Sequence, residues 1–391
     1  MSKIGNLLIV FAAMVSPIFG LAQSKPIAVD SVMEQIQRHL INQLHRLKPE
    51  GLYPRTVTPE NELVLRGSSD WTSGFLPGML WYMFEYTGST FWKKQAERWT
   101  AGLEFEKFNT NTHDVGFILF SSYGHGFRLT NRPHYKRVLL QGAKSLATRY
   151  DPEVGCTRSW EHGPWRFPVI IDNLMNLELL FWAARASDEQ QYLHIARQHV
   201  ITTMKNHYRP NGSAYHVVDY DPRSGRVLSR TNAQGYADES SWARGQSWGL
   251  YGFVMAYRET REKIFLTHAE KIASLFISRL PENYIPYWDF DAPNIPFEFQ
   301  DASAASIAAS ALLELSQLSP VNGSRYFECA ERMLQTLCSP GFFAEVGSNN
   351  NFLLKRNVGS MPSKKELGVP EIFSDYYLLE ALMRYRLIIN K

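Results

Sequence analysis

The sequence predicts an all-α protein in which six helical hairpins, each made of an outer and an inner helix, close into an α/α toroid. Two observations predict this fold. Apolar residues recur with helical periodicity along most of the chain, for example Phe265, Ala269, Ile272, Ala273 and Phe276. The connections also alternate between short turns and long loops, as expected when the turns lie on one rim of a ring and the loops on the other.

The expected helices divide into two sets by composition. Every second helix is apolar around most of its circumference, as in residues 75–84 and 302–315, and we expect these helices to form the inner ring. The other helices are amphipathic and belong outside. In chain order, the twelve expected helices lie near residues 30–48, 73–87, 89–107, 114–129, 133–149, 172–186, 188–205, 242–258, 261–279, 302–317, 323–338 and 374–390.

The long loops precede inner helices and are rich in Gly, Pro and aromatic residues. Because function concentrates on loops held by a rigid scaffold, we expect the site on the rim where the inner helices begin. The free N–H groups and dipoles of those helix N-termini favour an anionic ligand. One loop holds a strand-like stretch at residues 213–220, followed by a turn sequence at 221–225, which predicts half of a β-hairpin.

The first 22 residues have the features of a secretory signal peptide. Lys3 supplies a positive charge, residues 7–19 are mostly apolar, and Gly20 and Ala22 stand at the small-residue positions of a cleavage site. The alternative is a retained membrane anchor, for which the apolar run is short. We therefore expect an exported protein, periplasmic or secreted, in which residues 23–391 form one catalytic domain.

Charge, cysteines and motifs exclude several classes of function. The formal net charge of +3 is too small to draw the chain to nucleic acid. Metal-binding, P-loop and EF-hand patterns are absent, so we expect no metal and no cofactor. Residues 245–249 fit the G-x-S-x-G pattern of esterases, but that motif needs a strand before its serine, and here the serine lies in an expected helix. Cys156, Cys329 and Cys338 are expected to be free thiols.

Aromatic residues are abundant, with 10 Trp, 19 Tyr and 23 Phe. A large core is one explanation. The other is sugar binding, because rings in loops can stack on the apolar faces of sugars. The tryptophans that lie in or beside Gly-, Ser- and Pro-rich loops are Trp71, Trp160, Trp165, Trp242 and Trp248.

Acidic residues stand near the expected starts of inner helices, at Asp70, Asp114, Asp172, Glu239, Asp301 and Asp375. Each aspartate could simply cap its helix, and we assign Asp301 and Asp375 to capping. Asp114 differs because Gly116, two residues later, permits another group to approach the backbone closely. Asp172 differs because the apolar run at 167–171 would desolvate it and raise its pKa, as a general acid requires. We predict these two carboxylates as the catalytic pair.

For each of three basic residues near these positions, two roles are open. His113 and His216 can be hydrogen-bonded structural residues or residues of the site. Arg244 can pair with Glu239 or bind an anion.

At these residues the sequence resembles the unsaturated glucuronyl hydrolases, glycoside hydrolase family 88. The resemblance runs in the expected order over nearly the whole chain after residue 22, and it implies an (α/α)6 barrel, in agreement with the six expected hairpins. The matching stretches are SSDWTSGFLPGMLWY (68–82), THDVGF (112–117), IDNLMNLELLFWA (171–183), DESSWARGQSWGLYGF (238–253) and SDYYLLEALMR (374–384).

The resemblance implies an enzyme that releases unsaturated 4-deoxy-hexenuronic acid from the non-reducing end of lyase-generated glycosaminoglycan oligosaccharides. The implied reaction hydrates the C4=C5 bond instead of displacing a group at C1. Asp172 becomes the general acid/base, and Asp114 the second essential carboxylate. The implied substrate-binding residues are Trp71, His113, His216, Gln234 and Trp248. One departure lies before Asp172, where both Trp160 and Trp165 could be the family's substrate-contacting Trp.

A further likeness concerns sulfation. Ser360, Ser363 and Lys365 form an S-x-x-S-x-K pattern that resembles family members accepting sulfated disaccharides, and Arg244 could add a contact. The alternative is a solvated basic loop. At the level of function, two alternatives stay open: an unsaturated rhamnogalacturonyl hydrolase acting on pectin fragments, and a secreted sugar-binding toroid without catalysis. Neither nucleic acid nor a membrane is an expected partner.

Overall fold

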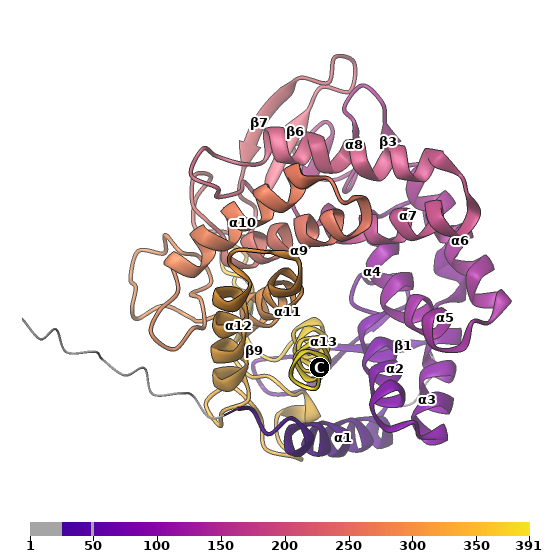
Figure 1. Cartoon of the computed structure of the whole chain (residues 1–391), viewed down its shortest axis with the longest axis vertical. Coiled ribbons are helices and arrows are strands. Elements are labelled where there is room, and N and C mark those ends of the chain that lie inside the picture. The colour runs from indigo at the N-terminus through magenta and orange to yellow at the C-terminus, as the bar shows by residue number, and fades with distance from the viewer. Residues whose placement is uncertain (1–25, 48–50) are drawn as a thin grey trace, which may run out of the picture.

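The computed structural model describes residues 26–47 and 51–391 (Figure 1). The predicted signal peptide lies outside the described residues. Within the described ranges, no helix is both long and apolar enough to cross a membrane.

An inner ring of helices surrounds the axis of the molecule. Each inner helix packs against the next one along the chain, and α13 packs back onto α2, which closes the ring. The inner elements are α2 (Phe75–Thr87), α4 (Val115–Leu119), the π-helical turn η2 (Phe120–Gly124), α5 (His125–Thr130), α7 (Asn173–Ser187), α9 (Ala243–Thr260), α11 (Ala302–Leu318) and α13 (Ile372–Ile389).

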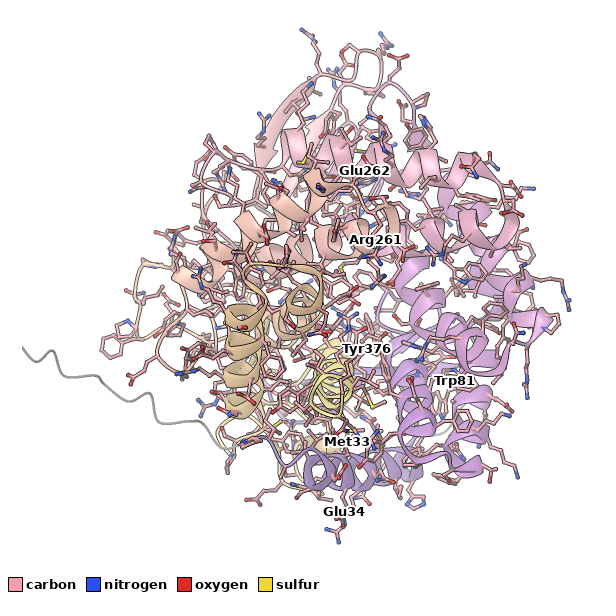
Figure 2. The ribbon with its side chains drawn as sticks, in the orientation of Figure 1. Met33, Glu34, Trp81, Arg261, Glu262 and Tyr376 are labelled. Carbon is pink, nitrogen blue, oxygen red and sulfur yellow. The ribbon has the colours of Figure 1, made fainter. Side chains whose placement is uncertain are left out.

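Six outer helices cover this ring, and the whole is an (α/α)6 barrel (Figure 1). Their amphipathic pattern is visible on α1, where Met33 is fully buried and neighbouring Glu34 is exposed to solvent (Figure 2). The outer helices are α1 (Val29–Arg46), α3 (Thr90–Ala101), α6 (Pro133–Ala147), α8 (Gln190–Asn206), α10 (Lys263–Ser278) and α12 (Gly323–Leu337), and two short 3-10 helices are η1 (Glu104–Phe108) and η3 (Asn349–Asn351).

The short turns all follow inner helices, as the sequence predicts. Four of them begin with a residue in the left-handed conformation, namely Gly88, Asn131, Asp188 and Arg261, with φ between 51° and 68°. A left-handed residue ends a helix and turns the chain back on itself. The outer helix that follows therefore packs against the inner helix that precedes it.

The expected helices are confirmed, with two differences in detail. The segment expected as one helix at 114–129 is interrupted by η2, where the Ser122 hydroxyl donates a hydrogen bond to the backbone oxygen of Ile118 (2.6 Å). The segment expected at 89–107 ends as an α-helix at Ala101 and continues as η1.

Short antiparallel strands lie in the loops that precede inner helices. The hairpin predicted from residues 213–225 is confirmed, because β6 pairs with β7, and β5 adds a third strand. The strands are β1 (Leu52–Val57), β2 (Leu63–Gly67), β3 (Tyr150–Asp151), β4 (Cys156–Thr157), β5 (Pro168–Ile170), β6 (Val217–Tyr220), β7 (Val227–Thr231), β8 (Asn357–Ser360) and β9 (Lys365–Val369).

Candidate active site

A cavity of about 300 Å³ opens on the rim where the inner helices begin. Its lining comes from the starts of α2, α4, α7, α9 and α13 and from the strands β1, β8 and β9. The residues predicted from sequence that line it are Trp71, His113, Asp114, Asp172, Gln234, Arg244, Ser360 and Lys365. The structure thus collects eight of the eleven predicted site residues in one cavity.

Asp172 stands at the N-terminus of α7, directly after the apolar strand β5. Its side chain makes no capping hydrogen bond, so the capping interpretation is wrong for this residue. Only 15% of the side chain is exposed, and Oδ2 is buried with no hydrogen-bond partner in the described part of the chain. Burial raises the pKa of Asp172 to about 7; nearby Arg244 opposes this rise, and Asp114 adds to it. The carboxyl can therefore hold a proton near neutral pH.

Asp114 is held by hydrogen bonds instead. Thr112 Oγ1 donates to Asp114 Oδ2 (3.0 Å), and Asn176 Nδ2 donates to Oδ1 (3.3 Å). Asp114 does not cap α4 either. Gly116 has the role that the sequence predicts, because a Cβ there would lie 2.6 Å from Asn176 Cα, so only glycine lets α4 and α7 approach this closely. That approach brings the two carboxylates to one wall of the cavity.

Two buried histidines flank the carboxylates. His216 Nδ1 accepts a hydrogen bond from the Ala233 N–H (3.2 Å), and Nε2 lies 3.8 Å from Asp172 Oδ2. Burial lowers the pKa of His216 to about 3, so the ring is neutral and carries its proton on Nε2, facing Asp172. His113 Nε2 lies 3.5 Å from Asp114 Oδ1, and burial lowers its pKa as well. Neutral imidazoles supply no charge that would force Asp172 to ionise.

Arg244 donates hydrogen bonds to several other groups of the protein. Its guanidinium donates to Asp301 Oδ2 (3.2 Å), to the Gly359 backbone oxygen (2.7 Å) and to Gln234 Oε1 (2.8 Å). The alternative pairing with Glu239 is wrong, because that carboxylate binds Arg209 on the surface (3.0 Å). Arg244 thus fixes β8 and Gln234 around the cavity.

The two aspartates assigned to capping differ from each other. Asp301 does cap α11, accepting a hydrogen bond from the Ser303 N–H (3.0 Å). Asp375 lies inside the first turn of α13 and accepts from the backbone of Leu353 (2.7 Å) and Leu354 (2.8 Å). The capping assignment of Asp375 is therefore wrong, and the residue fixes a loop.

The loop tryptophans divide between cavity and core. Trp71 lines the cavity, and its ring packs against Phe117 with 5.4 Å between ring centroids. Trp160 also lines the cavity, whereas Trp165 meets Trp160 edge-on at 5.7 Å without reaching the lining. Trp248 is 1% exposed and touches Phe117 from the other side (5.4 Å). Of the two competing tryptophans, Trp160 is the one that lines the cavity.

Two of the three residues of the predicted sulfate pattern line the cavity. Ser360 ends β8 and Lys365 begins β9, and both line the cavity. Ser363 lies in the exposed turn between these strands and is not part of the lining. His216 and Trp248 are the other two predicted residues outside the lining. His216 lies next to Asp172 and Trp248 packs against Phe117, and both Asp172 and Phe117 line the cavity.

Comparison with known proteins agrees with this geometry. A family model described as Glycosyl Hydrolase Family 88 matches residues 35–379. The chain belongs to glycosyl hydrolase family 88. It is 41% identical over 345 residues to the unsaturated glucuronyl hydrolase of Formosa agariphila, and the match covers 87% of this chain and 86% of that one. It is 29% identical over 377 residues to the unsaturated chondroitin disaccharide hydrolase of Streptococcus pneumoniae, and this match covers 92% of this chain and 91% of that one.

A solved structure is similar over the same extent. It is an unsaturated glucuronyl hydrolase specific for heparin, with a TM-score of 0.90 and 43% identity, covering 93% of this chain and 98% of that one. Family 88 members are glycoside hydrolases, and this chain is one of them.

Three charged residues of the family 88 cavity escaped the sequence analysis: Arg55, Glu366 and Glu371. Arg55 Nε donates to Glu366 Oε1 (2.8 Å), although the two residues are 311 positions apart. Neither periodicity nor a local motif signals them, because each is an ordinary charged residue in a loop or strand. Within the described ranges, no group of three or more His, Cys, Asp or Glu side chains is placed to hold a metal ion.

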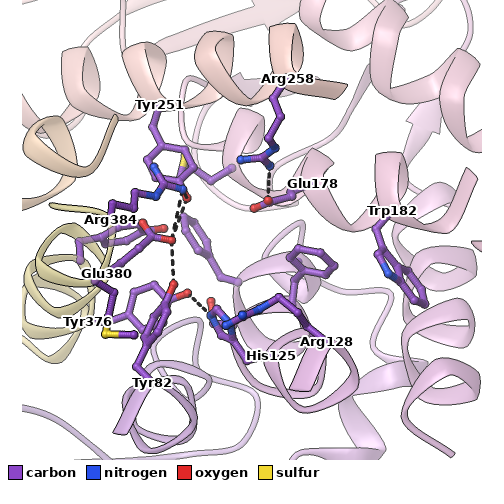
Figure 3. Close-up of a pocket in the computed structure, with 18 of the residues that line it drawn as sticks. Tyr82, His125, Arg128, Glu178, Trp182, Tyr251, Arg258, Tyr376, Glu380 and Arg384 are labelled. Carbon is purple, nitrogen blue, oxygen red and sulfur yellow. Dashed lines mark hydrogen bonds and ion pairs between the residues drawn. The ribbon is translucent and has the colours of Figure 1, made fainter. Parts of the chain in front are cut away.

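A second, larger cavity of about 600 Å³ lies at the other end of the barrel (Figure 3). Its polar groups are paired with one another. Glu380 accepts hydrogen bonds from Tyr82 (3.0 Å) and Tyr251 (3.1 Å), and Arg258 pairs with Glu314 (2.9 Å). Phe117 lines both cavities. The carboxylates named here are paired with protein groups, whereas Asp172 in the smaller cavity has an oxygen without a partner in the described part of the chain.

The G-x-S-x-G segment plays no catalytic part in this family 88 chain. Ser247 lies inside α9 and is fully buried, and its hydroxyl donates to the backbone oxygen of Ala304 (2.8 Å). An esterase nucleophile stands at a turn directly after a strand, whereas Ser247 lies within α9, and the preceding strand, β7, ends at Thr231.

Proposed function

We propose that this family 88 enzyme releases the unsaturated uronic acid from the non-reducing end of glycosaminoglycan oligosaccharides by hydrating its C4=C5 double bond. One observation carries the proposal: a buried carboxyl without a hydrogen-bond partner, Asp172, faces a cavity beside a second carboxylate, Asp114. Relatives with the same fold are named for hydrolysis of unsaturated glucuronyl and chondroitin substrates.

The first chemical step is proton transfer to carbon. Asp172, protonated at neutral pH because its pKa is about 7, donates its proton to C4, and the positive charge that develops is shared by C5 and the ring oxygen. The resulting Asp172 carboxylate then takes a proton from a water molecule as the water oxygen bonds to C5. The product of these two steps is a hemiketal, and Asp172 is protonated again.

Collapse of the hemiketal releases the second sugar. The bond from C5 to the ring oxygen breaks, C5 becomes a ketone, and the ring oxygen stays on C1. C1 is then a hemiacetal, which loses the leaving sugar as an alcohol and becomes an aldehyde. No bond from enzyme to sugar is needed, so the enzyme requires only an acid, a base and correct positioning.

Residues around Asp172 provide the positioning. Trp71 and Trp160 offer ring faces to the sugar, and Gln234 and Arg244 provide a polar edge. Asp114 stays hydrogen-bonded to Thr112 and Asn176, and its charge favours the protonated form of Asp172. His113 and His216 lie beside the two carboxylates, 3.5 Å from Asp114 and 3.8 Å from Asp172.

Sulfate recognition is part of the proposal. The ammonium group of Lys365 and the hydroxyl of Ser360 face the cavity and can hold a sulfate on the leaving sugar. Ser363 would contribute only if the turn between β8 and β9 moved inward. We also propose that the protein is exported to the periplasm or outside the cell, on the basis of the signal-peptide pattern in residues 1–22.

A panel of unsaturated disaccharides tests the function. The wild-type enzyme would be incubated with heparin-derived and chondroitin-derived disaccharides, each with and without sulfate, while the ultraviolet absorbance of the double bond is followed. We expect absorbance to fall with glycosaminoglycan substrates. Turnover only of an unsaturated rhamnogalacturonan disaccharide would contradict the proposal, and disaccharide binding without any loss of absorbance would indicate a binding protein. Sequencing the N-terminus of the exported product tests cleavage after residue 22.

A further inference from the structure

The cavity holds two carboxyl groups that the mechanism does not use, Glu366 and Glu371. Glu371 lies at the start of α13, is 1% exposed, and lines the cavity. Its Oε1 atom is buried and has no hydrogen-bond partner within the described part of the chain. An unpaired buried polar atom costs free energy that a folded protein usually avoids. Glu371 therefore needs an explanation beyond folding.

Neighbouring cations do not pair with Glu371. The Arg55 guanidinium is divided between Glu366 (2.8 Å) and Asp70 (3.1 Å), and that of Arg244 is held by the contacts described above. Glu366 comes close instead, because a Cβ built on Gly359 would lie 2.6 Å from Glu366 Oε2 and 3.0 Å from Glu371 Oε1. Two carboxyl groups thus meet across a glycine.

This arrangement makes a patch rich in hydrogen-bond acceptors. Burial, together with the negative charge of Glu366, raises the pKa of Glu371 well above its ordinary value, which favours the neutral carboxyl. The neutral carboxyl keeps a free acceptor oxygen. The adjacent charge of Glu366 disfavours an anion at this point, whereas Lys365, which suits an anion, is exposed at the cavity mouth. The ligand group that complements the patch is an N–H or O–H donor without negative charge.

The chemistry of the substrate places the leaving sugar near this patch. Asp172 acts at C4 of the uronic acid, and C1 lies across the pyranose ring from C4. The sugar attached to C1 therefore extends away from the wall formed by α4 and α7. Another part of the lining is formed by β8, β9 and the start of α13, and β9 and that helix start carry Glu366 and Glu371.

We propose that Glu371 is a specificity-determining residue that accepts a hydrogen bond from the acetamido N–H on C2 of the leaving sugar. The inference rests on the proposed function, since it takes the bound substrate to be an unsaturated uronic acid linked to an amino sugar. It assigns the enzyme a preference that Asp172 and Asp114 cannot supply, because they act on the other ring.

Two substrates and three variants test the proposal. The substrates are unsaturated disaccharides whose leaving sugar is either N-acetylglucosamine or 2-deoxyglucose, which lacks a donor on C2. The variants are Glu371→Leu, which removes the acceptor, Glu371→Gln, which keeps an acceptor and is neutral, and Glu282→Leu, a control in an exposed residue. Far-ultraviolet circular dichroism checks that each variant is folded, and Glu371→Met replaces the leucine variant if that one does not fold.

Removing the acceptor should lower kcat/KM on the acetamido substrate about tenfold, through KM, and on the 2-deoxy substrate less than about threefold. Glu371→Gln should restore most of the lost kcat/KM, and Glu282→Leu should match wild type on both substrates. Equal losses on the two substrates, or no loss on either, would overturn the proposal.

Binding measurements separate this inference from the proposed function. In Asp172→Asn protein, which should bind substrate without turning it over, isothermal titration calorimetry gives the Kd of each disaccharide with and without Glu371→Leu. A selective weakening of acetamido binding supports the role of Glu371 even if hydration were absent. Unselective weakening in this background would overturn the role of Glu371 while the wild-type turnover assay still reports on the function.

Discussion

Replacement of Asp172 by Asn tests both the mechanism and the electrostatics of the site. The amide cannot donate a proton to C4, so we expect kcat to fall by at least about 1,000-fold. The fold should remain intact, because the Asp172 side chain makes no capping bond and its Oδ2 has no partner. The same substitution should also increase the stability of the protein at alkaline pH.

The sign and size of that stability change follow from the pKa. Folding raises the pKa of Asp172 from 3.8 to about 7, so between these values the folded state holds a proton that the unfolded state has lost. The free energy of unfolding of the wild type therefore falls as pH rises through this window. At about 1.4 kcal/mol per pH unit the full effect is about 4 kcal/mol, and we expect about 2–3 kcal/mol because 15% of the side chain reaches solvent.

Urea unfolding at pH 4 and pH 8 measures this effect. The wild type and Asp172→Asn should have similar unfolding free energies at pH 4, and the variant should be more stable at pH 8. Asp375, whose pKa burial raises to about 8, contributes equally to both proteins and cancels. The reasoning fails if the variant keeps more than a tenth of wild-type turnover, or if the stability difference is the same at both pH values.

Three further substitutions give graded outcomes. Asp114→Asn should lower kcat at least about 100-fold. It should also move the alkaline limb of the pH profile of kcat/KM to lower pH, because the Asp114 charge raises the pKa of Asp172. An alkaline limb at the wild-type pH would contradict this coupling. Gly116→Ala should lower the unfolding free energy by about 1–3 kcal/mol in urea titrations, because its Cβ would lie 2.6 Å from Asn176 Cα. Gly341→Ala is the control and should leave the unfolding free energy unchanged, because the nearest atom to its Cβ is 3.6 Å away. Trp160→Ala should raise KM about tenfold and Trp165→Ala much less, because only Trp160 lines the cavity; the reverse order in steady-state kinetics would refute the assignment.

The helical framework could be predicted because its signal is local. Inner helices such as α11 are apolar on all sides, and outer helices such as α12 carry one apolar face, so composition alone separates the two sets. Loop lengths then order them into hairpins. The interruption of the helix at η2 could not be predicted, because it depends on how the hydroxyl of Ser122 bonds to the preceding turn.

The sequence could anticipate which predicted site residues share a cavity where those residues lie next to a helix start. Asp114, Asp172, Trp71 and Arg244 are placed at such starts, and the structure brings all four to one cavity. The sequence could not show where a side chain points or which distant residue it meets, and Ser363, for example, is exposed and lies outside the lining.

Periodicity, loop length and position relative to a helix end were enough to predict the ring of hairpins and the rim on which Asp114 and Asp172 share a cavity. The sequence could not show that Asp172 Oδ2 has no hydrogen-bond partner while Asp114 accepts a hydrogen bond from Asn176, because these contacts depend on how neighbouring helices pack. The structure also showed that Glu371 and Glu366 meet across Gly359. Arg55 pairs with Glu366, although the two residues are 311 positions apart. The physical reason is that solvent exclusion and charge pairing depend on distance in space, which residue spacing along a chain does not encode.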